Sequence, residues 1–217
     1  MEIIVTTLEI IGAIAFAVSG ALVGIRKNMD VFGVCVLGLS TAVGGGVIRD
    51  LILGETPPAM FTNPIYAIAG LATCLFVLIP EIRTMVERSE FALLLADAVG
   101  LGIFTASGTM HALETADANA FLAVFVGVVT GVGGGLLRDV MASVPPYIFT
   151  KHVYAVASIA GGILLCVIYP YVDKYIGLFI TSAFVVVLRL LASRFRWEIP
   201  KAEDVSLHHT KNHSGKE

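Results

Sequence analysis

Two segments of ten residues place three glycines and an Arg-Asp pair inside otherwise apolar sequence. The first phrase, 41–50, reads TAVGGGVIRD, and the second phrase, 130–139, reads TGVGGGLLRD, 89 positions later. Full charges inside membrane segments are costly, and they mark paths for ions or polar solutes. The repetition of the whole pattern indicates that two parts of the chain share one design.

The glycines of the two phrases allow several interpretations. A phosphate-binding loop is excluded because no Gly-Lys-Ser/Thr follows them and no strand precedes them. Close packing of two helices is one alternative, since small residues let backbones approach. The other is a helix kink that lines a pore, because each glycine lowers helix stability by about 1 kcal/mol relative to alanine. We predict the kink, with pore lining, at Gly44, Gly45, Gly46, Gly133, Gly134 and Gly135.

The charged residues have candidate partners on the segment that precedes each phrase. A helix rises about 1.5 Å per residue, which puts the first glycines about 20–23 Å along a helix that begins near residue 31. The first phrase then lies toward the outer face of the membrane, and an inverted second copy lies toward the inner face. We therefore expect charged pore ends or gates with two ion pairs, Glu9 with Arg49 and Asp97 with Arg138. The remaining acids, Asp50 and Asp139, point about 100° around the helix toward other neighbours or water. The alternative is that both arginines extend to the membrane interface.

Hydroxyl side chains on the same segments trace a plausible polar seam. They are Ser19, Ser40, Thr41, Ser107 and Thr130. Each is weak as a single indicator, because Ser and Thr in spanning helices usually bond to carbonyls of their own helix. A loop with His111, Glu114 and Asp117 is able to attract cations, and an ordinary solvated loop is the alternative.

Composition identifies the elements that position these residues. The chain is 57% hydrophobic and only 14% charged, with a mean hydropathy of +0.88, whereas soluble domains are about 25% charged. No basic run with interleaved aromatics suggests nucleic acid. The pattern predicts an all-α polytopic membrane protein whose seven transmembrane helices occupy 3–25, 31–53, 63–80, 91–110, 120–142, 152–170 and 175–193.

The repetition extends beyond the phrases. The pattern Glu-x2-Gly-x3-Phe-x2-Ser-Gly at 9–20 returns with Asp in place of Glu at 97–108, and Pro-Pro follows each phrase, at 57–58 and at 145–146. Three helices are an odd number, so the second copy enters the membrane inverted, as in many transporters. A duplication that only built a stable bundle is the alternative. The predicted units are 1–88 and 89–172 as inverted three-helix repeats, 173–199 as a seventh helix and 200–217 as a polar cytoplasmic tail.

Basic residues predict the orientation. With the N-terminus outside, the inner loops and tail receive Arg26, Lys27, Arg83, Arg88, Lys151, Arg194 and Arg196, and the outer loops receive only Lys174. Such asymmetry is typical of a cytoplasmic C-terminus. We expect a multi-pass protein of the plasma (inner) membrane. The tail histidines, His208, His209 and His213, are expected to be solvated.

With its paired Gly-Gly-Gly-x-x-Arg-Asp phrases followed by Pro-Pro, the chain resembles the prokaryotic branch of the trimeric intracellular cation (TRIC) channels over about residues 3–195. That family overlaps bacterial proteins described as glycine transporters. The resemblance implies a homotrimer with one pore per protomer, kinked at the glycines of the second and fifth helices. The basic lipid-contacting motif of eukaryotic members is absent, since 52–55 reads ILGE.

Two functions follow from the resemblance. The first is a potassium-preferring channel for monovalent cations, and the alternative is a secondary transporter of glycine or another small neutral solute by alternating access. An enzyme is not expected, because no Ser/His/Asp, Cys/His or metal-spaced cluster occurs in the membrane segments. Catalytic residues, metal ligands and cofactors are therefore predicted to be absent. The predicted partners are two further copies of the chain, K⁺ and membrane lipid, with no nucleic acid.

Overall fold

The computed structural model describes residues 2–87, 89–115, 119–150 and 153–197, and within these ranges every regular element is an α-helix. The helices are α1 (Glu2–Arg26), α2 (Val31–Leu53), α3 (Ala59–Thr62), α4 (Ile65–Val77), α5 (Pro80–Glu87), α6 (Glu90–Thr115), α7 (Ala120–Met141), α8 (Tyr147–Thr150), α9 (Tyr154–Ile168) and α10 (Lys174–Arg194). The predicted tail, 200–217, and Asp117 lie outside the described residues. The predicted all-α class is confirmed.

Five of these helices, α1, α2, α6, α7 and α10, are long and apolar enough to cross a membrane. Two predicted segments, 63–80 and 152–170, form the shorter apolar helices α4 and α9. Large phenylalanines lie on the surface, such as Phe32 (77% exposed) and Phe121 (80% exposed). Soluble monomers rarely expose so many large apolar side chains together, whereas lipid covers them at no cost. The chain is therefore a multi-pass membrane protein.

Local sequence explains where the two helices that carry the phrases begin and end. The Asp30 carboxylate caps α2 by accepting a bond of 2.7 Å from the backbone N–H of Gly33, and Asn119 caps α7 through Leu122 N–H at 2.9 Å. Helix α2 ends at Leu53, and the next residue, Gly54, forms a left-handed C-cap with a φ of 76°. These caps set the register in which the phrases reach the interior.

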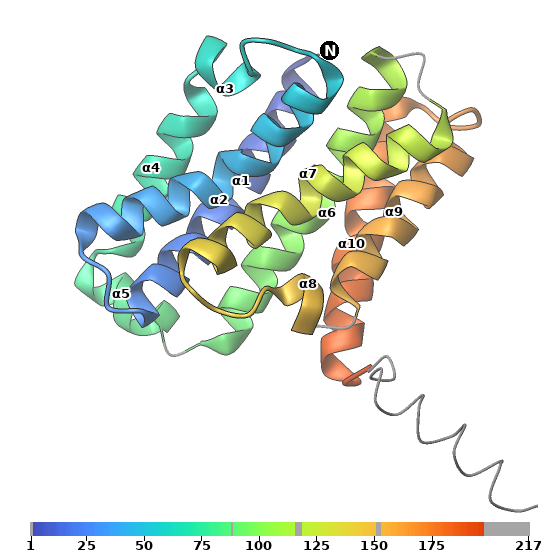
Figure 1. The fold of residues 1–217 in the computed structure, drawn as a ribbon. Helices are drawn as coiled ribbons and strands as arrows, with labels where there is room; N and C mark the ends of the chain where they lie inside the picture. Colours follow the sequence, from blue (N-terminus) through green and yellow to red (C-terminus); the bar gives the residue numbers. More distant parts are fainter. Residues whose placement is uncertain (1, 88, 116–118, 151–152, 198–217) are drawn as a thin grey trace, which may run out of the picture.

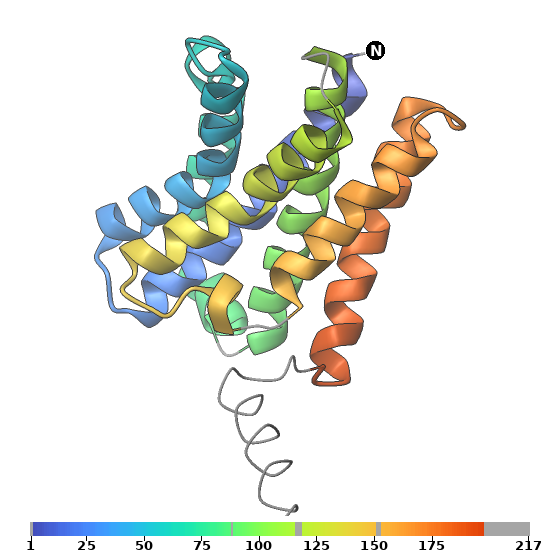
Figure 2. The same cartoon turned by 45° about the vertical axis from the view of Figure 1, so that its right-hand side comes forward.

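The helices pack around α1, α2, α6 and α7, with α4 beside α1 and α2, and α9 and α10 beside α6 (Figure 1). Figure 2 shows α3 at the end where the chain starts, and α8 at the opposite end, where α10 finishes. Phe16 of α1 and Phe104 of α6 stack with ring centroids 5.4 Å apart in the core. The short helices that follow the two phrases thus lie at opposite ends of the bundle.

Candidate functional site

Helices α2 and α7 meet at the glycines of the two phrases. A Cβ atom on Gly45 would lie against the carbonyl oxygen of Thr130, and a Cβ on Gly134 would lie against that of Thr41. A Cβ on Gly133 would be 3.3 Å from the Cα of Gly45. Only glycine permits such close backbone contact, as the packing interpretation predicts. Both helices continue through their phrases, and the kink stays a prediction.

The first phrase ends in a cluster of buried charges, here called the first-half cluster. Arg49 donates from Nη1 to Glu9 at 2.9 Å and from Nε to Asp50 at 2.8 Å. The Tyr66 hydroxyl donates to the second Glu9 oxygen at 3.0 Å. The second Asp50 oxygen accepts from the backbone N–H of Ala59, at the start of α3, at 2.8 Å. The cluster thus joins α1, α2, α3 and α4.

The second phrase builds the same arrangement from different helices, here called the second-half cluster. Arg138 donates from Nη1 to Asp97 at 2.7 Å and from Nε to Asp139 at 2.8 Å. Asp139 accepts from the backbone N–H of Tyr147, at the start of α8, at 2.8 Å. The Tyr154 hydroxyl lies 3.5 Å from Asp97. Each side chain therefore repeats the role of its counterpart in the first-half cluster.

These contacts decide two expectations from the sequence. Both predicted arginine–carboxylate pairs are present, and neither arginine extends to the interface, since Arg49 is 6% exposed and Arg138 is fully buried. The expectation for Asp50 and Asp139 was wrong in part, because each binds the arginine beside it as well as another element. A long guanidinium side chain folds back over its own helix, so its Nε reaches the adjacent aspartate while Nη1 reaches the preceding segment.

The two clusters differ in what covers them. Arg138 donates to the Ser19 hydroxyl of α1 and lies 4.9 Å from the centroid of the Tyr147 ring. Burial raises the pKa of Tyr147 above its ordinary value.

A cavity of about 30 Å³, enough for a water molecule, adjoins the first-half cluster. It is lined by residues that include Glu9, Gly46, Arg49, Asp50, Ala59 and Tyr66. A Cβ on Gly46 would meet nothing within 4 Å, whereas on Gly135 it would lie 2.6 Å from the Tyr154 hydroxyl. The first-half cluster thus adjoins a small cavity, whereas Arg138 and Asp97 of the second-half cluster are fully buried. A larger cavity, of about 720 Å³, is lined by residues that include Tyr147 and Arg189.

The hydroxyl side chains of the predicted polar seam do not form a continuous chain of hydrogen bonds among the described residues. Thr41 and Thr130 donate to carbonyls of their own helices, each at 2.6 Å, as single hydroxyls in spanning helices usually do. Ser40 is half-buried in α2. Ser107 is buried, with no hydrogen-bond partner among the described residues. Among the residues of this seam, Ser19 is the one with a hydrogen bond from the other half, donated by Arg138.

Sequence reasoning missed the aromatic cover of the clusters. Tyr66 and Tyr154 follow the Pro-Pro pairs at matching positions, which is a signal the repeat contains. Arg189 is the single charge within 175–193 of α10, and it lies 4.9 Å from the centroid of the Tyr154 ring. It is 4% exposed, so α10 adds a second buried guanidinium beside the second-half cluster.

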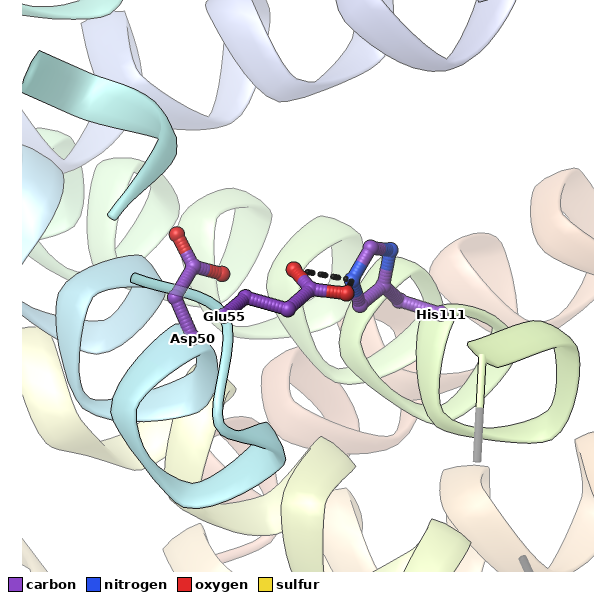
Figure 3. A group of neighbouring side chains, drawn as sticks. All are labelled: Asp50, Glu55 and His111. Carbon is purple, nitrogen blue, oxygen red and sulfur yellow. Dashed lines mark hydrogen bonds and ion pairs between the residues drawn. The ribbon is translucent and has the colours of Figure 1, made fainter. Parts of the chain in front are cut away.

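The structure also brings together one group of potential metal ligands that the sequence analysis did not single out. Asp50, Glu55 and His111 bring one potential ligand atom each to within 4.8 Å of one another (Figure 3). His111 and Glu114 lie on α6 and not on the expected loop. His111 contacts Glu55, and Glu114 pairs with Lys174 at 2.9 Å, with side chains that are still about one third exposed. Spacing along the chain does not reveal such a group, because Glu55 and His111 are 56 residues apart.

A protein-family model described as "Glycine transporter" matches residues 6–81 and 94–170, most of the chain. The chain belongs to this family. The UPF0126 inner membrane protein YadS of Escherichia coli K12 is 36% identical over 192 residues, covering 88% of this chain and 92% of that protein. A UPF0126 membrane protein of Deinococcus radiodurans is 38% identical over 170 residues, covering 77% of this chain and 78% of that protein.

Solved structures extend the comparison of this glycine-transporter family member to TRIC channels. The TRIC orthologue from Rhodobacter sphaeroides is 33% identical, with a TM-score of 0.82 over 89% of this chain and 98% of that one. A TRIC channel from a study of cation conductance is 36% identical, with a TM-score of 0.81 over 90% and 96%. The resemblance to prokaryotic TRIC channels is confirmed, together with the overlap between the two groups.

Proposed function

We propose that this protein is a homotrimeric channel for monovalent cations, preferring potassium, with one pore in each protomer along α2 and α7. The observation that carries the proposal is the pair of buried charged clusters at the two ends of the glycine contact. The similarity to solved TRIC cation channels, one of them named as trimeric, supports it.

Seven spanning helices with an inverted 3+3 repeat, and an outer N-terminus, complete the proposal. Support comes from the two separate matches to the family model, 6–81 and 94–170. The opposite placement of α3 and α8 in Figures 1 and 2 is what inversion requires. The basic residues of the loops favour a cytoplasmic C-terminus. In this orientation the first-half cluster is the outer end of the pore.

Charge selectivity follows from the composition of each cluster. The first-half cluster holds two carboxylates, Glu9 and Asp50, and one guanidinium. The second-half cluster has the same ratio. Each set of three has an excess of one formal negative charge when its members are ionised, which attracts cations and repels anions in a low-dielectric passage. At the second-half cluster Arg189, buried over the Tyr154 ring, offsets this excess, so the charge preference rests on the first-half cluster. Within the described residues Asp97 Oδ2 has no hydrogen-bond partner, so this buried oxygen is able to bind water or a cation once the second-half cluster opens.

The second-half cluster also supplies a gate. Arg138 is held by Asp97, Asp139 and Ser19 and is covered by the ring of Tyr147. Opening requires this side chain to leave Ser19, and the glycines of α7 provide a place where the helix is able to kink. The small cavity beside Glu9 and Arg49 gives room for water at the first-half cluster, whereas the fully buried Arg138 blocks passage at the second-half cluster.

Transport of glycine or another small neutral solute is the second candidate. The family description favours it, and so does the contrast between one cluster beside a cavity and one that is fully buried, since alternating access needs two ends that differ. Purified protein in liposomes distinguishes the two when potassium flux and uptake of labelled glycine are measured side by side. Potassium flux with unitary current steps is expected, and saturable glycine uptake without ionic current would refute the channel.

A further inference from the structure

Three side chains converge beside the first-half cluster, as Figure 3 shows. His111, near the end of α6, has Nε2 at 2.9 Å from both carboxylate oxygens of Glu55. Glu55 directly follows the C-cap of α2, and its side chain lies between His111 and Asp50. The side chains of His111 and Glu55 are each 34% exposed, and Asp50 is buried. The group therefore combines a fixed inner ligand with two that solvent reaches.

The corresponding place at the other end of the bundle is apolar. The backbone N–H of Glu55 bonds to the carbonyl of Asp50 at 2.8 Å, and that of Val144 bonds to the carbonyl of Asp139 at 2.9 Å, so Glu55 and Val144 occupy the same turn. His111 follows Val23 by 88 positions, the offset that relates Glu9 to Asp97. Val144 packs against the apolar core cluster that contains Val23. One end thus has two potential ligands where the other has two valines.

We propose that Asp50, Glu55 and His111 form a binding site for a divalent transition-metal ion of the zinc type. One imidazole nitrogen and two carboxylates are a ligand set that suits zinc, with water completing the coordination at the exposed side. Bonds of about 2.0–2.2 Å place two ligands of one ion at most about 4.4 Å apart. The observed separations of up to 4.8 Å therefore close with a small side-chain movement.

The surroundings of the site favour a dication. Glu9, Asp50 and Glu55 supply three carboxylates against the single guanidinium of Arg49. Arg49 Nε and the N–H of Ala59 each bond one Asp50 oxygen at 2.8 Å and orient that carboxylate, as outer-shell groups do in metal sites. Each oxygen retains a second lone pair for a metal. A bound ion would join the turn after α2 to the end of α6.

Zinc binding to the full-length protein tests the site. The background variant replaces the other four histidines, at 152, 208, 209 and 213, with asparagine, because any imidazole is able to bind zinc by itself. Isothermal titration with ZnCl₂ in detergent micelles is expected to show one saturable site per chain. His111→Ala should abolish this site, and Glu55→Gln should weaken it at least tenfold. Glu114→Gln, which alters an acid near the same end of α6, is the matched control and should bind zinc like the background.

A second measurement separates metal binding from folding. Zinc should raise the melting temperature of the background variant and leave that of His111→Ala unchanged, although both melt alike without metal. If His111→Ala does not fold, His111→Gln takes its place. The proposal fails if the background shows no saturable site, or if zinc binds equally well after replacement of His111, in which case the pair with Glu55 is a structural contact only. Neither readout depends on transport.

Discussion

The unequal burial of the two charged clusters predicts unequal costs for removing a carboxylate. The side chains of Arg138 and Asp97 are both 0% exposed, whereas those of Arg49 and Glu9 are 8% and 12% exposed beside a cavity. Asp97→Asn keeps the shape of the side chain and removes its charge, so Arg138 is left buried with one of its two acids. Removing one partner of a buried pair costs about 3–5 kcal/mol, and we expect about 3 kcal/mol because Asp139 still compensates in part.

The equivalent change in the first-half cluster should cost less. Glu9→Gln leaves Arg49 with Asp50 and with room for water in the adjoining cavity, so we expect about 2 kcal/mol, between the values for exposed pairs and for fully buried pairs. The assay is denaturant unfolding of the purified protein in micelles, followed by circular dichroism. Glu114→Gln, which breaks an exposed pair with Lys174, serves as control and should show no measurable change. A loss for Glu9→Gln equal to or greater than that for Asp97→Asn would refute the burial argument.

Two further predictions concern the glycine contact and the gate. Gly46→Ala should be tolerated or stabilise the protein by up to about 1 kcal/mol, because its Cβ meets open space. Gly45→Ala should lower the melting temperature and the potassium flux, because its Cβ would meet the Thr130 carbonyl; equal melting temperatures for the two variants would contradict the close-packing interpretation. Ser19→Ala removes the hydroxyl that accepts from Arg138, a bond to a charged group worth about 1.5–3 kcal/mol. Potassium flux into liposomes should rise about tenfold because the contact that holds Arg138 in the gate is lost. An unchanged or lower flux would count against this gate.

Much of the fold was predictable because the signals are local. Hydropathy located the long helices within a few residues, although α6 continues to Thr115 where the prediction ends at residue 110. His111 therefore lies on a helix and not in a loop. The sequence did not predict this, because polar residues at the end of a membrane segment are equally compatible with a loop. Depth arithmetic predicted both arginine–carboxylate pairs, because a constant rise per residue converts sequence position into height in the membrane.

The sequence by itself determined the all-helical membrane class and the repeated residue pattern, and it predicted which charges lie at the same height, since all three depend on composition and on regular helix geometry. Only the tertiary structure decided which groups at one height touch. Ser19 meets Arg138 across 119 positions, and His111 meets Glu55 across 56. Height says nothing about rotation of a helix or about which helices are neighbours. Those follow from how the glycines let α2 and α7 pack, and that packing buries Arg138 completely and leaves Arg49 beside a small cavity.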